Sequence, residues 1–208
     1  MSNYKYKIET EIISKIKNLQ KPNILELGVK TGISTNLFLN LCKSNHGKLF
    51  SVDIDDCSKV SSNKNWTFIK SRDDNFSKIF KLIPRKIDVI YIDTIHEADH
   101  VENILYKYFK RLKIGGYIFI DDISHLPYQK NKPRNNFYCE INNQETFYRL
   151  LEIFNANQKN IDLSFSFISS GTAIIKKKKN IINLKKKILS RKYSLKNNLK
   201  KIRNLVSF

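Results

Sequence analysis

Acidic and imidazole side chains follow two apolar runs of the chain, at the points where predicted strands end. Asp93 and His96 come directly after one run, and Asp121 and Asp122 come directly after the next. Because the carboxyl ends of parallel strands meet at one edge of a sheet, we expect these side chains to converge on one rim. Carboxylates gather against their mutual repulsion most readily around a hard cation such as Mg²⁺. The imidazole, with an ordinary pKa of about 6.5, suits proton removal at neutral pH.

The same groups also have a purely structural interpretation. Asp121 and Asp122 are consistent with one buried acid followed by a helix N-cap, and His96 is consistent with a cap of the helix that follows it. Both interpretations stay open at the level of the sequence.

A glycine-containing turn follows the first predicted strand. Residues 24–34 read ILELGVKTGIS, with Gly28 and Gly32 four positions apart. Glycine lets the backbone approach a ligand closely, and the N–H groups at the start of the next helix favour a carboxylate. Lys30 stands where the second glycine of the G-x-G-x-x-G fingerprint belongs, so the turn need not accommodate a pyrophosphate. A nucleoside that carries an amino acid fits better than a dinucleotide.

Two acids complete the predicted nucleoside site. Asp53 ends the second predicted strand, where a carboxylate can accept both hydroxyls of a ribose. Glu26, inside the first strand, either accepts from the ammonium group of a ligand or organises the turn. The alternative is an ordinary strand–helix turn with a surface aspartate. The turn, the strand order and Asp53 together favour the nucleoside site.

Apolar runs and helical patterns alternate along the chain, which predicts a parallel sheet with helices on both faces. We expect strands at 23–27, 49–54, 66–69, 87–92, 117–120, 163–168 and 172–175, and helices at 8–19, 34–42, 74–82, 98–112 and 144–155. The prediction is a doubly wound, Rossmann-like α/β fold with a seven-stranded, mostly parallel sheet and one antiparallel strand. An N-terminal helix within 1–22 would pack on the core domain, 23–175, and 176–208 would form a basic helical tail.

Loop signals at 123–142 interrupt this alternation at a place suited to acceptor binding. We expect residues 123–160 to shape the acceptor pocket. The side chains there that suit stacking on a ring or holding an anionic group are Tyr128, Arg134, Phe137 and Tyr138.

The segment ELGVKTGIST, followed by SVDID, resembles motif I and the ribose-binding acid of the class I S-adenosylmethionine-dependent methyltransferases. The resemblance extends over 23–175 and implies that S-adenosylmethionine is the cofactor. It implies cofactor contacts at Glu26, Gly28, Thr31, Gly32, Ser34 and Asp53 and, after the third strand, at Asp73.

The D-x-x-H pattern at 93–96 and the acidic pair at 121–122 resemble the metal-dependent O-methyltransferases of macrolide sugars and the cephalosporin hydroxylase-like group. Catechol O-methyltransferase is a more distant likeness. This resemblance implies Asp93, Asp121 and Asp122 as ligands of Mg²⁺ or another divalent cation, and His96, together with Asp93, as catalytic. Asp121 stands where the sugar enzymes commonly carry a longer acid. We therefore expect O-methyl transfer to a hydroxyl of a sugar or other small molecule.

Positive charge is concentrated at the end of the chain. The 208 residues carry a formal net charge of +19, and residues 176–208 hold eleven Lys, two Arg and no acidic residue. An apolar stripe through 181–208 predicts a basic amphipathic helix. Such a helix suits an anionic membrane surface, self-association or packing on its own domain, and nucleic acid is a weaker alternative.

Composition also bears on location. No apolar run approaches the ~20 residues that span a bilayer, and the N-terminus lacks a secretory pattern. Three scattered cysteines, Cys42, Cys57 and Cys139, have no metal-binding spacing and fit a reducing compartment. We expect a cytoplasmic protein, or one held peripherally at the inner membrane face by its tail.

Three rival functions stay open. The charge favours an RNA or other nucleic-acid methyltransferase, but residues 93–96 read DTIH instead of the [D/N]-P-P-[Y/F] motif that holds a base amine. A membrane-tethered protein without catalysis on the same fold is the second, and the intact glycine turn and Asp53 argue against it. A hydroxylase-like reaction on the same fold is the third.

Overall fold

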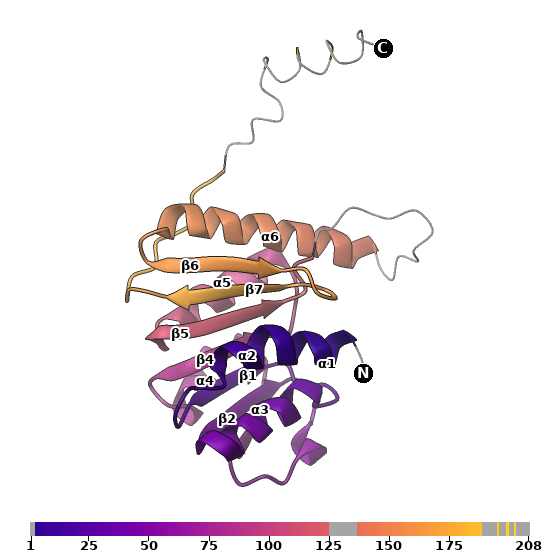
Figure 1. Ribbon diagram of the computed structural model, residues 1–208, viewed down its shortest axis with the longest axis vertical. Coiled ribbons are helices and arrows are strands. Elements are labelled where there is room, and N and C mark those ends of the chain that lie inside the picture. The colour runs from indigo at the N-terminus through magenta and orange to yellow at the C-terminus, as the bar shows by residue number, and fades with distance from the viewer. Residues whose placement is uncertain (1–2, 125–136, 189–194, 196–198, 200–201, 203–208) are drawn as a thin grey trace.

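The computed structural model describes residues 3–124 and 137–188, together with residues 195, 199 and 202. Its strands are β1 (Asn23–Leu27), β2 (Lys48–Asp53), β3 (Trp66–Lys70), β4 (Ile87–Ile92), β5 (Leu112–Asp121), β6 (Ile161–Ser166) and β7 (Thr172–Lys177). They form one seven-stranded sheet in the order β3-β2-β1-β4-β5-β7-β6 (Figure 1). β7 is antiparallel to both of its neighbours, whereas the other pairs are parallel. The predicted fold class is confirmed.

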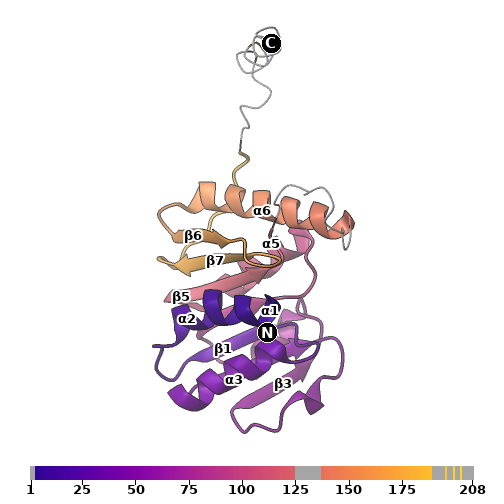
Figure 2. The same cartoon turned by 45° about the vertical axis from the view of Figure 1, so that its right-hand side comes forward.

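The main helices are α3 (Ile33–Asn45), α4 (Phe76–Leu82), α5 (Ala98–Phe109) and α6 (Phe137–Asn157), and the short 3₁₀ turn η2 spans Ser58–Val60. α4, α5 and α6 bury their apolar side chains in one cluster against the sheet, and α3 and the N-terminal helix bury theirs in a second. Figures 1 and 2 show α3 and the N-terminal helix together on one face, opposite α5. The sheet is therefore covered on both faces, which explains why the central strands are apolar throughout.

The N-terminal helix is one continuous rod of three segments: α1 (Asn3–Lys7), the π-helical η1 (Ile8–Ile13) and α2 (Ser14–Ile16). Ile8, Ile12 and Ile16 are fully buried against the sheet. Their spacing of four residues gives the apolar face that the sequence predicts. Wider π turns occur mostly at functional sites, and this one directly follows Lys7.

Two elements, β5 and α6, begin at least five residues before their predicted starts. β5 begins at Leu112, inside the span assigned to the preceding helix, because the chain turns into the sheet directly after Phe109. A register shift between β4 and β5 accommodates the extra residues before Gly116. α6 begins at Phe137 instead of Gln144.

The segment after the sheet differs from the predicted tail helix. β7 extends to Lys177, and residues 181–188 have no helical structure. They run beside α6: the Asn183 N–H donates to Asn157 Oδ1 at 2.7 Å, and the Lys186 N–H donates to the Glu152 carbonyl at 3.0 Å. These bonds use the backbone groups that a helix would need for itself. Most of the remaining tail lies outside the described residues.

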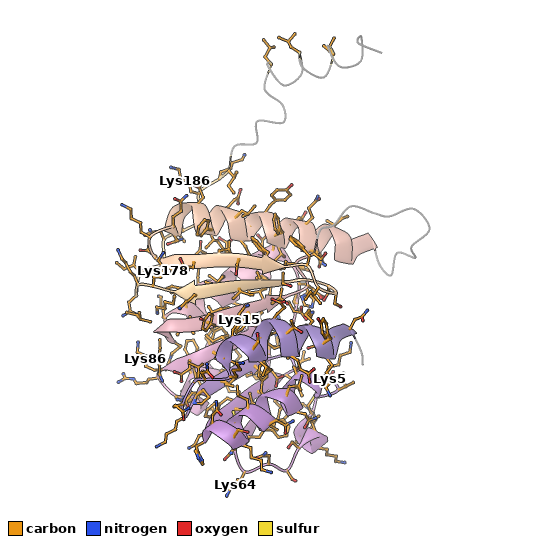
Figure 3. All side chains as sticks on the ribbon, viewed as in Figure 1. Lys5, Lys15, Lys64, Lys86, Lys178 and Lys186 are labelled. Atoms are coloured by element: carbon orange, nitrogen blue, oxygen red, sulfur yellow. The ribbon has the colours of Figure 1, made fainter. Side chains whose placement is uncertain are left out.

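Lysines are distributed widely over the domain. The six that are labelled in Figure 3 are widely separated in that view, from Lys64 at the bottom to Lys186 at the top. Within the described part of the chain, no helix has both the length and the apolar character needed to span a membrane.

Candidate functional site

The turn between β1 and α3 depends on glycine. Gly28 has a φ of +97°, and a Cβ at this position would lie 2.0 Å from the carbonyl oxygen of Asp93. The Gly28 N–H donates to the Val52 carbonyl at 2.9 Å. Gly32, with a φ of +77°, is the N-cap of α3. The turn therefore packs its backbone against the ends of β2 and β4, which a larger residue would prevent.

Glu26 has the second of its two expected roles. Its carboxylate is fully buried and accepts from the Ser34 hydroxyl at 2.6 Å, the Thr35 hydroxyl at 2.8 Å and the Ser51 hydroxyl at 2.6 Å. Burial raises the pKa of Glu26 to about 7, against the effect of the three hydroxyl donors. Glu26 thus joins β1, β2 and the start of α3 and does not reach a cavity.

Asp53 also organises the turn while facing a cavity. Its carboxylate accepts from the backbone N–H groups of Val29 at 2.7 Å, Lys30 at 3.0 Å and Asp55 at 2.9 Å. Burial acts to raise the pKa of Asp53, but these N–H donors outweigh it and hold the pKa below its ordinary value. Asp53 lines a cavity of about 260 Å³ together with Ser71. The predicted ribose-binding acid is therefore ionised and lies where a ligand can reach it.

Asp73 closes the far end of this cavity. Its side chain accepts from the Thr94 hydroxyl at 2.5 Å and lies 2.8 Å from His100 Nε2. The Tyr108 hydroxyl donates to the Asp73 backbone carbonyl at 2.8 Å. These contacts hold the wall of the smaller cavity in place. Asp73 is 6% exposed, so the part of it that faces the cavity is small.

A larger cavity of about 580 Å³ adjoins the first. Both are lined by Gly28, Lys30, Asp93 and Thr94. The predicted residues Thr31 and Ser34 line the larger cavity, whereas Gly32 lines neither. A nucleoside near Asp53 would therefore extend past Gly28 towards the second cavity.

The imidazole of His96 lies in the larger cavity between two carboxylates. His96 Nε2 is 3.5 Å from Asp93 Oδ1 and 3.4 Å from Asp122 Oδ2. The side chains are about one-quarter exposed, and Asp122 has a left-handed backbone, with a φ of +56°. Glu97, and not His96, is the N-cap of α5. The arrangement suits an imidazole that accepts a proton and is stabilised by two acids.

The N-terminal helix supplies two further site residues that the sequence reasoning missed. Tyr4 lines the larger cavity, and its hydroxyl donates to Asp93 Oδ2 at 2.8 Å. Lys7, on the same face of the helix, places its ammonium group on Asp121 Oδ1 and donates to the Ser170 hydroxyl at 2.7 Å. Tyr4 continues the four-residue spacing of the apolar face, which is the sequence signal that could have indicated its inward orientation.

Tyr91 connects Asp121, which is buried, with Asp93, which is partly exposed. Its hydroxyl lies 3.0 Å from Asp121 Oδ2, 3.1 Å from Asp93 Oδ2 and 3.0 Å from the Tyr4 hydroxyl. Burial and the nearby Asp93 charge raise the pKa of Asp121 to about 6, and Lys7 acts in the opposite direction. The two phenols and the lysine thus form one hydrogen-bonded network with the carboxylates.

This network bears on the predicted metal ligands. Asp121 is 2% exposed, and its two oxygens contact Lys7 and Tyr91. All three predicted ligands line the larger cavity, but their ligand atoms do not all lie within 4.8 Å of one another. Among the described residues, the group whose ligand atoms all lie within 4.8 Å of one another is Asp73, Asp74 and His100. The three-carboxylate cation site therefore does not fit this arrangement, because an ammonium group occupies the cation's place beside Asp121.

Part of the expected acceptor pocket lies outside the described residues. This holds for Tyr128 and Arg134 and for the side chains of Phe137 and Tyr138. From the described part, the Thr146 hydroxyl of α6 donates to the His96 backbone carbonyl at 3.1 Å. α6 therefore helps to position the residue at the rim.

A comparison with models of known protein families gave a match to the central region of the chain. Residues 25–123 match the family model described as a methyltransferase domain. The matched span is 99 of the 208 residues, just under half of the chain. The match confirms the expected enzyme class, and the matched span contains the glycine turn, Asp53, His96 and both acids that follow β5. A comparison with curated proteins gave no match.

Solved structures share the fold at low sequence identity. The S-adenosylhomocysteine-bound methyltransferase PaMTH1 of Podospora anserina has a TM-score of 0.65 at 14% identity, over 80% of this chain and 76% of that one. A putative caffeoyl-CoA O-methyltransferase of Staphylococcus aureus has a TM-score of 0.62 at 15% identity, over 85% and 84%. MycE of the mycinamycin pathway, solved with Mg and S-adenosylhomocysteine, has a TM-score of 0.58 at 20% identity. That match covers 81% of this chain but 48% of MycE.

Proposed function

We propose that this methyltransferase domain transfers the methyl group of S-adenosylmethionine to a hydroxyl of a sugar or other small molecule, with His96 as general base. The observation that carries the proposal is the position of His96, between Asp93 and Asp122 in a cavity that adjoins the glycine turn. Proton removal is needed where a neutral hydroxyl is to attack a methyl group. The S-adenosylhomocysteine bound in PaMTH1 and in MycE supports the choice of methyl donor.

The residues of the turn fit S-adenosylmethionine. Asp53 is placed to accept the ribose hydroxyls in the smaller cavity. Thr31 and Ser34, at the start of α3, line the larger cavity, where the helix N-terminus favours the ligand's carboxylate. The donor's reactive carbon would then lie near Gly28, which lines both cavities.

The chemistry then divides between cofactor and protein. S-adenosylmethionine, when bound, would supply an activated methyl group for the acceptor oxygen, and S-adenosylhomocysteine would be the leaving group. His96 takes the proton of the acceptor hydroxyl, and Asp93 and Asp122 stabilise the imidazolium that results. Tyr4 and Tyr91 hold Asp93 in position through its Oδ2 oxygen. Alignment of the acceptor oxygen with the methyl group and the sulfur atom of the donor would supply the rest of the rate enhancement.

The test combines a binding and a turnover measurement. Calorimetry should detect S-adenosylhomocysteine binding to the wild-type chain and to His96→Ala with nearly equal affinity. Turnover with labelled S-adenosylmethionine and a panel of sugars and phenols should fall ~10²–10⁴-fold in His96→Ala. His46→Asn is the matched control, because His46 is exposed and has a left-handed backbone that Asn tolerates. A large loss of cofactor affinity in His96→Ala would instead assign His96 a structural role.

The same panel of acceptors also tests RNA, which is the rival class of acceptor. RNA is included because the chain is strongly basic. Methylation of RNA, without methylation of any small hydroxyl compound, would contradict the proposal and support the nucleic-acid alternative. Absence of S-adenosylhomocysteine binding would support a non-catalytic protein on this fold.

A further inference from the structure

A buried lysine from outside the sheet lies among the acids of the rim. Lys7 is fully buried, and Asp121, which its ammonium group contacts, is 2% exposed. The two residues are 114 positions apart in the chain. A charged ammonium is expensive to bury and is tolerated where carboxylates and other acceptors surround it. The contacts of Lys7 meet this requirement.

Several elements position the Lys7 ammonium group. Ser170, in the turn between β6 and β7, accepts from it at 2.7 Å, and the Tyr4 ring centroid lies 5.0 Å away. The isoleucines that follow Lys7 along the N-terminal helix are buried in the core beside the sheet. The burial of this apolar face fixes the backbone of Lys7 beside the sheet, and the contacts with Asp121 and Ser170 fix its ammonium group.

Hydrogen bonds connect Lys7, through Asp121 and Tyr91, to the partly exposed Asp93. Asp121 shares the Tyr91 hydroxyl with Asp93, and Asp93 contacts His96. The carboxylates of Asp93 and Asp121 are thus joined through the Tyr91 phenol, with the Lys7 ammonium group beside Asp121. This is the neutralising position that the acidic pattern of the sequence led us to assign to a divalent cation.

We propose that Lys7 is a tethered cation that replaces a divalent metal at this rim, so that methyl transfer by this chain requires no added metal. The test of this inference by enzyme activity rests on the proposed function, whereas the test by metal binding is independent of the proposed function. Lys7 is a positioning residue: it fixes Asp121 and, through Tyr91, the orientation of Asp93.

Binding of Mn²⁺ to the full chain tests the proposal directly, with electron paramagnetic resonance as the readout. The wild-type chain should show no Mn²⁺ binding that depends on Asp122, because the ammonium group lies beside Asp121. Lys7→Ala should bind Mn²⁺ at least tenfold more tightly than wild type, since it leaves Asp93 and Asp121 without their counter-charge. Lys5→Ala, which removes an exposed lysine of the same helix, is the matched control and should behave as wild type.

A double variant, Lys7→Met with Asp121→Asn, removes the lysine and the acid together and should not gain Mn²⁺ binding. Mn²⁺ binding by the wild-type chain that is lost in Asp122→Asn would overturn the proposal, and this result needs no Lys7 variant to fold. A folded Lys7→Ala protein, judged by circular dichroism, that gains no Mn²⁺ binding would also contradict it.

The activity arm uses the wild-type chain. Turnover should be unchanged after treatment with EDTA, and a loss that Mg²⁺ restores would overturn the proposal. S-adenosylhomocysteine binding distinguishes the two proposals. If the ligand does not bind, the proposed function fails, whereas the Mn²⁺ result still decides whether Lys7 is the cation of the rim.

Discussion

At the scale of single residues, the roles of the acids follow from their partners more than from their positions along the chain. Asp53 accepts from three backbone N–H groups and keeps a low pKa beside a cavity. Glu26, on the neighbouring strand β1, is buried and accepts from three hydroxyl groups, and its pKa is raised. Both belong to the motif that the sequence indicates, but Asp53 faces ligand space and Glu26 faces the core.

The raised pKa of Glu26 predicts a pH-dependent stability. Its pKa is about 7 in the folded chain, against an ordinary value of 4.5. A group whose pKa rises on folding binds its proton more tightly in the folded state, so its stabilising contribution is complete below pH ~4.5 and is lost as pH rises through about 7. Glu26→Gln should remove this dependence. Urea unfolding at several pH values should show wild type losing stability across this window relative to Glu26→Gln.

The control for this experiment is Glu145→Gln, which changes an exposed side chain of α6. Its pH profile should follow that of wild type. Parallel profiles for wild type and Glu26→Gln would contradict the raised pKa.

At the scale of elements, the N-terminal helix is part of the site and also part of the core. Its apolar face is buried beside the sheet, while Tyr4 and Lys7 reach the acids of the rim. The π-helical segment lies between these polar residues and the end of the helix. Stability and site geometry are therefore coupled through this one element.

Removing apolar contacts of the helix should destabilise the domain. Ile12 is fully buried, so Ile12→Ala should lower the free energy of unfolding by ~2–5 kcal/mol. Urea titration followed by circular dichroism would measure this loss. Ile114→Ala, at a position that is 59% exposed, should change stability by less than ~0.5 kcal/mol. Equal effects of the two substitutions would show that the helix does not pack as described.

At the scale of the whole molecule, a compact α/β domain is joined to a strongly basic end. Residues 181–188 follow α6, where Lys185 also pairs with Glu102 of α5 at 2.6 Å. Residues 189–208 contain six basic residues and no acidic one. These basic residues therefore follow a segment that hydrogen bonds and an ion pair hold against α6 and α5.

A truncated chain that ends at Ile188 should keep its thermal stability but lose most of its binding to anionic membrane surfaces. The midpoint of thermal unfolding should change by less than ~3 °C, which corresponds to ~1 kcal/mol for a chain of this size. Binding to vesicles that contain phosphatidylserine should fall at least ~10-fold, because each basic residue near such a surface contributes ~1 kcal/mol. A much lower midpoint would instead indicate that the tail packs on its own domain, and unchanged vesicle binding would argue against a membrane role.

The sequence was sufficient for those features whose causes are local. The alternation of apolar runs with helical patterns predicted the order of strands and helices, because the periodicity of a segment reflects which of its faces is buried. Gly28 and Gly32 indicated the turn because each has a positive φ that other residues avoid. Asp53 and His96 were predicted as site residues because Asp53 ends one strand, His96 lies shortly after another, and the ends of parallel strands meet at one edge.

Contacts between distant segments decided the rest. No local pattern could show that Lys7 contacts Asp121, that Glu26 is closed off by Ser51, or that the chain after Lys177 runs beside α6 without forming a helix. Each of these depends on the packing of elements that are far apart in the chain. The sequence by itself determined the fold, the glycine turn and the acidic rim, whereas the tertiary structure decided which charged groups face the cavity and that Lys7 pairs with Asp121, because burial and pairing are properties of the packed chain.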